Sequence, residues 1–200
     1  TFKTLEYHLD EWNLYLNSGK KWLKTGYKEL DDSLPVGILP NQLIVWVAKP
    51  SVGKTQIAIN ILYRMMVMYP EDDFLFFSLE LNGYEVLDRL AKIHRFYDLG
   101  VTTIEQSIAF FSNRLFIYDK NRITVNDLWS HTHSLLERTG RVPKAAFMDY
   151  LGYYANGYAG DGSYEKVSQA AADLKGWTKE FKIPMFVPHQ TTKSNKPGEV

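Results

Sequence analysis

The sequence predicts an α/β protein with a doubly wound, mostly parallel sheet and helices on both faces. Three observations predict this fold class. Near-continuous apolar runs, typical of strands that are covered on both faces, recur along the chain. Stretches with the apolar spacing of amphipathic helices separate these runs. The first run leads into a loop rich in phosphate-binding residue types, and this loop opens a helix, as in a doubly wound α/β unit.

The elements are expected in a regular order. A turn and short helix over residues 25–34 precede the first strand, and Pro188 at the end of the last strand predicts a short or edge position for it. The expected strands and helices alternate as strand 43–47, a helix with the stripe Ile57 to Met65, strand 74–79, a helix carrying Val86, Leu87, Leu90 and Ile93, strand 115–118, helix 125–137, strand 145–148, a helix with the stripe Val167 to Phe181, and strand 185–187.

The composition suits one domain with one core, because 45% of the 200 residues are hydrophobic and 23% are charged. The chain has no cysteine, which excludes disulfides and thiolate metal sites. No apolar stretch reaches the roughly 18 residues of a membrane span, and no basic and apolar leader opens the chain. A cytoplasmic protein without a membrane partner is expected. The 23 basic and 23 acidic residues balance, so any nucleic-acid binding must be local.

The first 24 residues are expected to form a linker helix and a linker, and residues 25–200 the main domain. Leu5, Leu9, Trp12 and Leu16 follow the spacing of one helix face. This apolar stripe could pack on its own domain or on a neighbouring subunit, and the sequence favours neither. The chain starts at Thr1 and stops in a polar stretch, which suggests a piece of a longer protein.

The loop after the first strand is a predicted phosphate-binding loop. It fits the G-x-x-x-x-G-K-[ST] pattern except that Ala48 replaces the first glycine. Backbone N–H groups of such a loop and the positive end of the next helix bind a polyphosphate such as ATP. Lys54 adds a positive charge, and Thr55 would place its hydroxyl on Mg²⁺. The predicted nucleotide-binding residues are Ala48, Lys49, Pro50, Ser51, Val52, Gly53, Lys54 and Thr55.

Three further strands end in polar residues, and in a parallel sheet these ends meet at one edge, where ligands bind. Asp149 could hold Mg²⁺ through its water shell, as a Walker B aspartate does. Glu80 could act as the general base, and Gln190 could sense the terminal phosphate through its amide. The alternative is that each is a solvated loop residue, which is the commoner fate of a lone acid after a strand.

Together these motifs resemble those of the DnaB-type hexameric replicative DNA helicases, whose C-terminal ATPase domain has the RecA-like P-loop NTPase fold. The resemblance runs from about Thr25 to Gln190, and His189 stands where the family has serine. Residues 48–55 resemble the family's Ala-Arg-Pro-Ser-x-Gly-Lys-Thr, residues 76–80 its Phe-Phe-Ser-Leu-Glu, residues 148–151 its Ile-Asp-Tyr-Leu and residues 189–190 its Ser-Gln.

The resemblance implies a motor domain that hydrolyses ATP with Mg²⁺, translocates on single-stranded DNA and unwinds duplex as a homo-oligomeric, hexameric ring. Primase or other replication proteins would be its partners. By the same resemblance Lys54 and Thr55 bind nucleotide and magnesium, Glu80 is the catalytic base, Asp149 the Walker B acid and Gln190 the sensor. The family's last strands and arginine finger are expected beyond Val200.

The resemblance also implies two DNA-facing loops in the ring's channel. Residues 152–163 combine glycine with repeated tyrosine, which suits a mobile loop that stacks bases. Residues 191–198 supply lysines for phosphates. The alternative is that both are plain flexible loops. The candidate DNA-binding residues are Tyr153, Tyr154, Tyr158, Lys193 and Lys196.

Other functions fit the same motifs. A RecA-fold ATPase that does not unwind DNA, such as a recombinase, a loader or a regulatory ATPase, would carry nearly the same phosphate site. A nucleotide-binding assembly module, in which ATP only joins subunits, is the alternative from another class. Glu80 argues against that module, because binding alone does not need a base.

Overall fold

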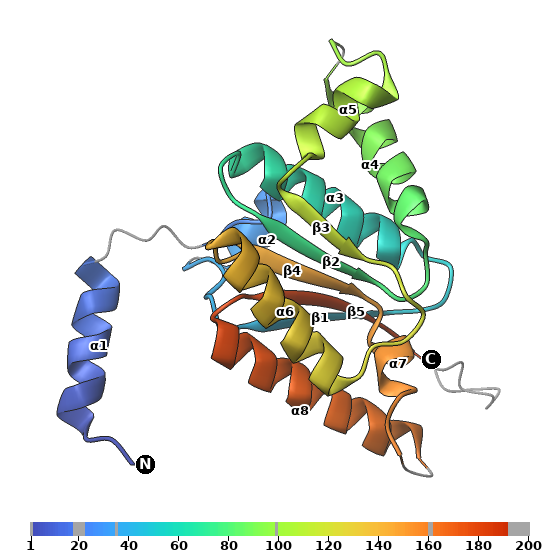
Figure 1. The fold of residues 1–200 in the computed structure, drawn as a ribbon. Coiled ribbons are helices and arrows are strands. Elements are labelled where there is room, and N and C mark those ends of the chain that lie inside the picture. Colours follow the sequence, from blue (N-terminus) through green and yellow to red (C-terminus); the bar gives the residue numbers. More distant parts are fainter. Residues whose placement is uncertain (1, 18–22, 35, 99, 160–161, 192–200) are drawn as a thin grey trace.

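The computed structural model describes residues 2–17, 23–34, 36–98, 100–159 and 162–191. Within these ranges the strands form one five-stranded parallel sheet in the order β1-β5-β4-β2-β3 (Figure 1). The predicted doubly wound, parallel α/β fold is therefore confirmed. The strands are β1 (Leu43–Ala48), β2 (Phe74–Ser78), β3 (Leu115–Tyr118), β4 (Ala145–Asp149) and β5 (Met185–Gln190).

Helices cover both faces of the sheet. Figure 1 shows α3, α4 and α5 on one face and α6 and α8 on the other. The helices are α1 (Leu5–Asn17), α2 (Lys28–Ser33), α3 (Lys54–Met68), α4 (Gly83–Tyr97), α5 (Ile104–Phe111), α6 (Val125–Thr139), α7 (Leu151–Ala155) and α8 (Ser163–Phe181).

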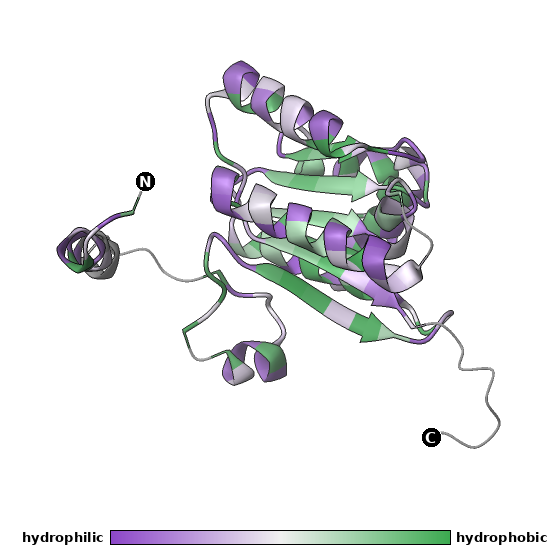
Figure 2. Cartoon of the chain, turned by 90° about the horizontal axis from the view of Figure 1, so that it is seen from below, coloured by the Kyte–Doolittle hydropathy of each residue, from purple (hydrophilic) through white to green (hydrophobic). Residues whose placement is uncertain are grey.

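The core has two halves, one on each face of the sheet. Strand β2 is buried along its whole length, with Phe74 and Phe76 in one half and Leu75 and Phe77 in the other. Figure 2 shows hydrophobic strands between helices that carry both polar and apolar residues. Because both faces of β2 are covered, it reads as a continuous apolar run instead of an alternating one.

The prediction of a short or edge position for the last strand was wrong. Strand β5 has six residues and lies between β1 and β4. Its pairing with β4 covers only Met185 and Phe186, whereas its pairing with β1 continues to Gln190. Pro188 therefore lies beyond the last residue paired with β4, where a strand tolerates a missing N–H.

Helix α5 was not predicted, although the sequence contains a signal for it. Thr103 and Gln106 form a capping box, in which the Thr103 side chain accepts from the backbone N–H of Gln106 and the Gln106 side chain accepts in return. The T-x-x-Q pattern is a sign of a helix start. Short apolar helices such as α5 are hard to detect by periodicity alone.

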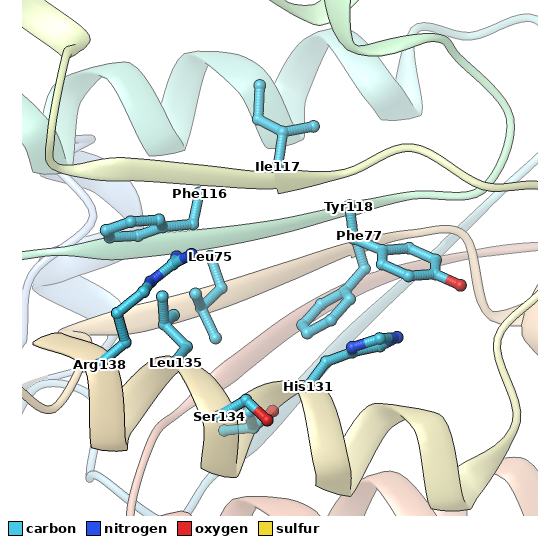
Figure 3. A pocket seen from close by; sticks show the side chains of 10 residues that line it. Leu75, Phe77, Phe116, Ile117, Tyr118, His131, Ser134, Leu135 and Arg138 are labelled. Atoms are coloured by element: carbon cyan, nitrogen blue, oxygen red, sulfur yellow. The ribbon is translucent and has the colours of Figure 1, made fainter.

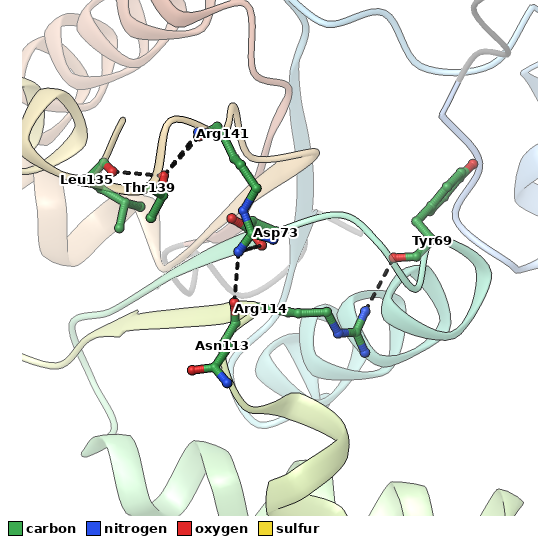
Figure 4. Close-up of polar contacts among 7 residues, drawn as sticks. All are labelled: Tyr69, Asp73, Asn113, Arg114, Leu135, Thr139 and Arg141. Carbon is green, nitrogen blue, oxygen red and sulfur yellow. Dashed lines mark hydrogen bonds and ion pairs between the residues drawn. The ribbon is translucent and has the colours of Figure 1, made fainter. Parts of the chain in front are cut away.

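A polar network joins the loops at the amino edge of the sheet, opposite the phosphate loop (Figure 4). Asp73, just before β2, is 2% exposed and lies 2.9 Å from the Arg141 guanidinium. Burial raises the pKa of Asp73, and the Arg141 charge opposes this shift. Arg141 also donates to the Asn113 carbonyl, and Arg114 donates to the Tyr69 carbonyl. These contacts connect the starts of β2, β3 and β4.

Figure 1 shows helix α1 apart from the sheet. Of its predicted apolar stripe, Leu5, Leu9 and Trp12 are between 50% and 71% exposed. The helix itself is confirmed. Packing of this stripe on its own domain or on a neighbouring subunit stays a prediction. None of the described helices is long and apolar enough to cross a membrane.

Candidate functional site

The chemistry-bearing residues meet in a cleft at the carboxyl ends of β1, β2, β4 and β5, as expected for a parallel sheet. The cleft is lined by Pro50, Ser51, Gly53, Lys54, Thr55, Gln56, Glu80, Arg89, Asp149, Tyr150 and Gln190.

A different hollow lies between β3 and α6, at the edge of the sheet farthest from β1 (Figure 3). The Arg138 guanidinium lies 5.9 Å from the Phe116 ring centre, and His131 and Tyr118 have ring centres 5.3 Å apart. The hollow has an apolar floor and no carboxylate among its lining. An apolar floor without a carboxylate is typical of packed side chains, so we assign the candidate site to the cleft instead.

The phosphate loop has the backbone that its sequence requires. Strand β1 ends at Ala48, helix α3 begins at Lys54, and Gly53 has a φ of 89°. Only glycine adopts this left-handed region without strain, so the second glycine of the motif is needed here. Ala48 is paired with Gln190 as part of the strand. Because this residue is extended, alanine can replace the first glycine of the motif.

Lys54 is held inside the loop. Its side chain is 8% exposed, and its ammonium donates a 2.9 Å hydrogen bond to the Lys49 carbonyl. An ammonium has three protons, and this is the one hydrogen bond it makes among the described residues. Two donors therefore remain for an anion in the cleft.

Thr55 and Asp149 meet across the cleft from positions 94 residues apart, where the Thr55 hydroxyl donates to Asp149 Oδ2 at 2.7 Å. Asp149 is 1% exposed, and its Oδ1 has no hydrogen-bond partner among the described residues. Burial raises the pKa of Asp149 to about 6. The Thr55 hydrogen bond and the Arg89 and Lys54 charges lower this pKa, whereas the Glu80 charge raises it.

Glu80 and Gln190 lie on opposite sides of Asp149, because β4 separates β2 from β5. Glu80 comes two residues after β2, is exposed and lines the cleft. Gln190 is the last residue of β5 and lines the same cleft. All the predicted catalytic and metal-binding side chains are therefore together in one place, with solvent access for Glu80.

Arg89 also lines the cleft, although the sequence analysis does not include it in the site. The structure gives Arg89 no ion pair among the described residues and places it in the cleft lining. The sequence signal for Arg89 is the apolar pattern of helix α4. The buried residues Val86, Leu90 and Ile93 fix the orientation of this helix and therefore the direction of the adjoining Arg89. Its charge lowers the pKa of Asp149.

The predicted mobile loop over residues 152–163 begins as a helix, α7, because Leu151, Tyr154 and Ala155 pack into the core. Tyr154 is 2% exposed, and burial raises its pKa to about 12. The Tyr158 hydroxyl donates to the Asp173 carboxylate at 2.6 Å and lies 2.9 Å from the Tyr154 hydroxyl. Among the described tyrosines of this segment, Tyr153 is the most exposed, at 37%, and Tyr158 is half-buried. Lys193 and Lys196 lie outside the described residues.

The sequence model of the DnaB-like helicase C terminal domain matches residues 22–197. The chain belongs to this family. It is 25% identical to the replicative DNA helicase DnaB of Buchnera aphidicola subsp. Schizaphis graminum and 27% identical to that of Haemophilus influenzae. These alignments cover 96% and 89% of the chain but only 45% and 40% of the relatives. The chain thus spans less than half the length of the curated relatives it matches.

Two solved structures share the fold of this DnaB-like domain. The ATPase domain of G40P superposes with a TM-score of 0.77, at 22% identity, over 96% of this chain and 73% of that one. A DnaB-like replicative helicase, solved in a study of its interactions with primase, gives 0.75, also at 22% identity, over 96% and 49% of the two chains. The expected RecA-like ATPase fold is confirmed.

Membership in the DnaB-like family implies nucleotide use, and the residues present fit a magnesium nucleotide. The free Asp149 Oδ1 is a buried carboxylate oxygen aimed at no protein donor, which suits a hydrated divalent cation. The Thr55 hydroxyl, which contacts the same carboxylate, is the usual second protein oxygen near such a cation. The remaining Lys54 donors suit phosphate oxygens.

Burial of the ionised Asp149 carboxylate is expected to lower the free energy of unfolding of this DnaB-like domain, by an amount that depends on pH. Its pKa is 3.8 in the unfolded chain and about 6 in the fold, so the cost is fully present above pH 6 and is relieved as the pH falls toward 4. Asp149→Asn should therefore raise the free energy of unfolding of the nucleotide-free protein at pH 8 by up to about 3 kcal/mol. The gain should vanish near pH 4.

Urea unfolding of wild type and Asp149→Asn at pH 8 and pH 4 measures this difference. The matched control is Asp32→Asn, because Asp32 is an exposed aspartate in an ion pair on the surface of α2. If Asp149→Asn were less stable than wild type at pH 8, the assignment of a destabilising buried charge to Asp149 would be wrong.

Proposed function

We propose that this chain is the ATP-hydrolysing motor domain of a ring-shaped replicative DNA helicase. The observation that carries the proposal is the 2.7 Å contact between Thr55 and Asp149, which joins the phosphate loop to the end of β4. The remaining cleft residues supply the other groups that phosphoryl transfer needs: a cation at Lys54, a carboxylate at Glu80 and an amide at Gln190. The division of the chain into a linker at 1–24 and a motor domain at 25–200 belongs to this proposal.

In the proposed mechanism, each cleft residue has one task. Thr55 and Asp149 would hold Mg²⁺, and a bound Mg²⁺ would supply positive charge beside the phosphates. The Lys54 ammonium leaves or shares its contact with the Lys49 carbonyl to bind phosphate oxygens. Glu80 accepts the proton of the attacking water, and its exposure gives that water access. The Gln190 amide, at the tip of β5, contacts the terminal phosphate, and this contact is lost when the phosphate leaves.

The proposal extends to assembly and DNA. We infer a hexameric ring, from the family, and contacts to single-stranded DNA from Tyr153 and from Lys193 and Lys196. Tyr153 offers the exposed ring that base stacking requires. Tyr154 is buried and Tyr158 is half-buried in this conformation, and their contacts to DNA stay predictions. Primase is a proposed partner, since one structural neighbour was studied for its interactions with primase.

The decisive experiment uses full-length protein and measures ATP hydrolysis with and without single-stranded DNA, together with unwinding of a forked duplex. DNA-stimulated hydrolysis with unwinding is the expected result. Stimulation without unwinding would favour a RecA-fold ATPase such as a recombinase or loader. ATP binding without hydrolysis would favour an assembly module.

DNA affinity should depend on assembly. The chain has no net charge, so a single subunit should bind single strands weakly. A ring of about six copies would gather roughly a dozen lysine charges from positions 193 and 196, and binding should fall steeply with salt. Titrations at two salt concentrations on monomer and oligomer fractions test this. Changing both lysines to alanine should flatten the salt dependence and leave nucleotide binding unchanged; tight, salt-insensitive binding by the monomer would refute the idea.

A further inference from the structure

Residues 156–159, which follow helix α7, are tied to helix α8 by a chain of three side chains. The Tyr158 hydroxyl donates to the Asp173 carboxylate at 2.6 Å and lies 2.9 Å from the Tyr154 hydroxyl. A hydroxyl has one proton to donate. Because Tyr158 gives this proton to Asp173, the Tyr154 hydroxyl is the donor in the second contact. The hydrogen bonds therefore run from Tyr154 to Tyr158 and on to Asp173, which is the final acceptor.

The two tyrosines of this chain are held differently. Tyr154 is 2% exposed and belongs to the same half of the core as Leu174 of α8. Tyr158 is half-buried and packs against that half of the core, with its ring centre 5.5 Å from that of Tyr154. Moving Tyr154 would open a cavity in the core, which is costly. Tyr158 is therefore the ring that can turn outward while the core stays closed.

The backbone next to Tyr158 adds little to hold it in place. Helix α7 ends at Ala155, and α8 begins at Ser163. Asn156 and Gly157 are exposed. A glycine loses more conformational freedom on ordering than any other residue, so position 157 favours release of the segment. The side chain of Tyr158 is therefore an important anchor of residues 156–159.

The final acceptor carries a charge that is directed at Tyr158 alone among the described residues. Asp173 is half-buried and forms no ion pair within the described part of the chain. A hydrogen bond to an ionised acceptor is about twice as strong as a neutral one, so one carboxylate can hold the ring. Burial, followed by the Asp173 contact, raises the pKa of Tyr158. The hydroxyl is therefore protonated at neutral pH, and the bond to Asp173 is present.

We propose that Asp173 is a latch that holds the Tyr158 ring against α8 and so keeps it from binding a ligand. Release of the latch would add a second exposed ring to that of Tyr153, and an exposed ring is what base stacking requires. Asp173 acts through Tyr158 and is a positioning residue. The use of the released ring on single-stranded DNA rests on the proposed function, whereas the latch itself does not.

The first test measures backbone hydrogen exchange by mass spectrometry on the full-length protein without nucleotide or DNA. Asp173→Ala removes the acceptor, and Tyr158→Phe keeps the ring but removes the hydroxyl. Asp173→Asn keeps an oxygen acceptor and removes only the charge. Glu180→Ala, which changes an exposed glutamate of the same helix, is the matched control and should behave as wild type.

Loss of one charge-assisted hydrogen bond changes an equilibrium roughly tenfold or more. We therefore expect exchange of residues 156–159 to rise by about that factor in Asp173→Ala and Tyr158→Phe, and by less in Asp173→Asn, while α7 stays protected. Wild-type exchange in the first two variants would overturn the latch. An equal rise throughout α7 and α8 would also overturn it, because that result indicates a general loss of stability. If Asp173→Ala does not fold, Tyr158→Phe and Asp173→Asn decide the question.

The second test asks whether the released ring acts on DNA. Affinity for a thymidine oligonucleotide and the DNA concentration at half-maximal stimulation of ATP hydrolysis are measured for wild type, Asp173→Ala and the double variant Asp173→Ala/Tyr158→Ala. Stacking of one base on an aromatic ring changes affinity roughly fivefold or more. We expect Asp173→Ala to bind DNA more tightly by about that factor, to need less DNA for stimulation, and to hydrolyse ATP without DNA at the wild-type rate.

Each result of the second test has one meaning. A gain in Asp173→Ala that disappears in the double variant supports a ring that the latch withholds from DNA. A gain that the double variant keeps would overturn this role of the Tyr158 ring, as would unchanged affinity in a variant whose exchange shows release. A wild-type protein that neither binds DNA nor hydrolyses ATP would refute the proposed function, and the exchange experiment would still decide the latch.

Discussion

Lys54→Ala is expected to lose ATP binding and hydrolysis while the fold is retained. Lys54 is nearly buried, and among the described residues its ammonium hydrogen-bonds only to the Lys49 carbonyl, so its removal breaks little within the protein. A hydrogen bond between charged groups contributes about 1.5 to 3 kcal/mol, and the loss should be larger in the transition state, where charge on the phosphates increases. At least a tenfold loss of ATP affinity and a much larger loss of turnover should follow.

Isothermal titration with a non-hydrolysable ATP analogue and a steady-state phosphate assay measure the two effects. Lys179→Ala, which removes an exposed lysine of helix α8, is the matched control and should behave as wild type. Circular dichroism and the unfolding midpoint show whether Lys54→Ala is folded. If both affinity and hydrolysis stayed at wild-type levels in this variant, the phosphate-loop assignment would be wrong.

Glu80→Gln is expected to bind ATP with Mg²⁺ normally and to hydrolyse it at least roughly a hundredfold more slowly, the range for loss of a general base. The substitution keeps the size and hydrogen bonding of the side chain but removes its basicity. It also removes the Glu80 charge, which raises the pKa of Asp149, so Asp149 should bind magnesium no worse than before.

Single-turnover hydrolysis with pre-bound ATP isolates the chemical step from nucleotide binding. Glu137→Gln, which changes an exposed glutamate of helix α6, is the control. A hydrolysis rate in Glu80→Gln equal to that of wild type would assign Glu80 to the solvated loop instead. A rate that falls only because ATP binds more weakly would point to a binding role and not to a base.

Much of the site could be predicted from sequence because its motifs are made of residues that are neighbours in the chain. The phosphate loop is a run of eight neighbouring residues between a strand and a helix. Glu80, Asp149 and Gln190 could be grouped without contacts, because the carboxyl ends of parallel strands share one edge. The predicted strands followed from near-continuous apolar runs, and most helices followed from apolar residues spaced with a period of 3.6. The roles of these residues in catalysis stay predictions until the variants are measured.

What only the tertiary structure decided depends on neighbours far apart in the chain. Packing inserted β5 between β1 and β4 despite Pro188, because β4 pairs with only its first two residues. Packing of α4 on α3 directed Arg89 into the cleft, and core contacts of α7 buried Tyr154. The pKa of Asp149 depends on burial and on a hydroxyl 94 positions away. Periodicity reports which face of an element is apolar, but it does not report which element covers that face.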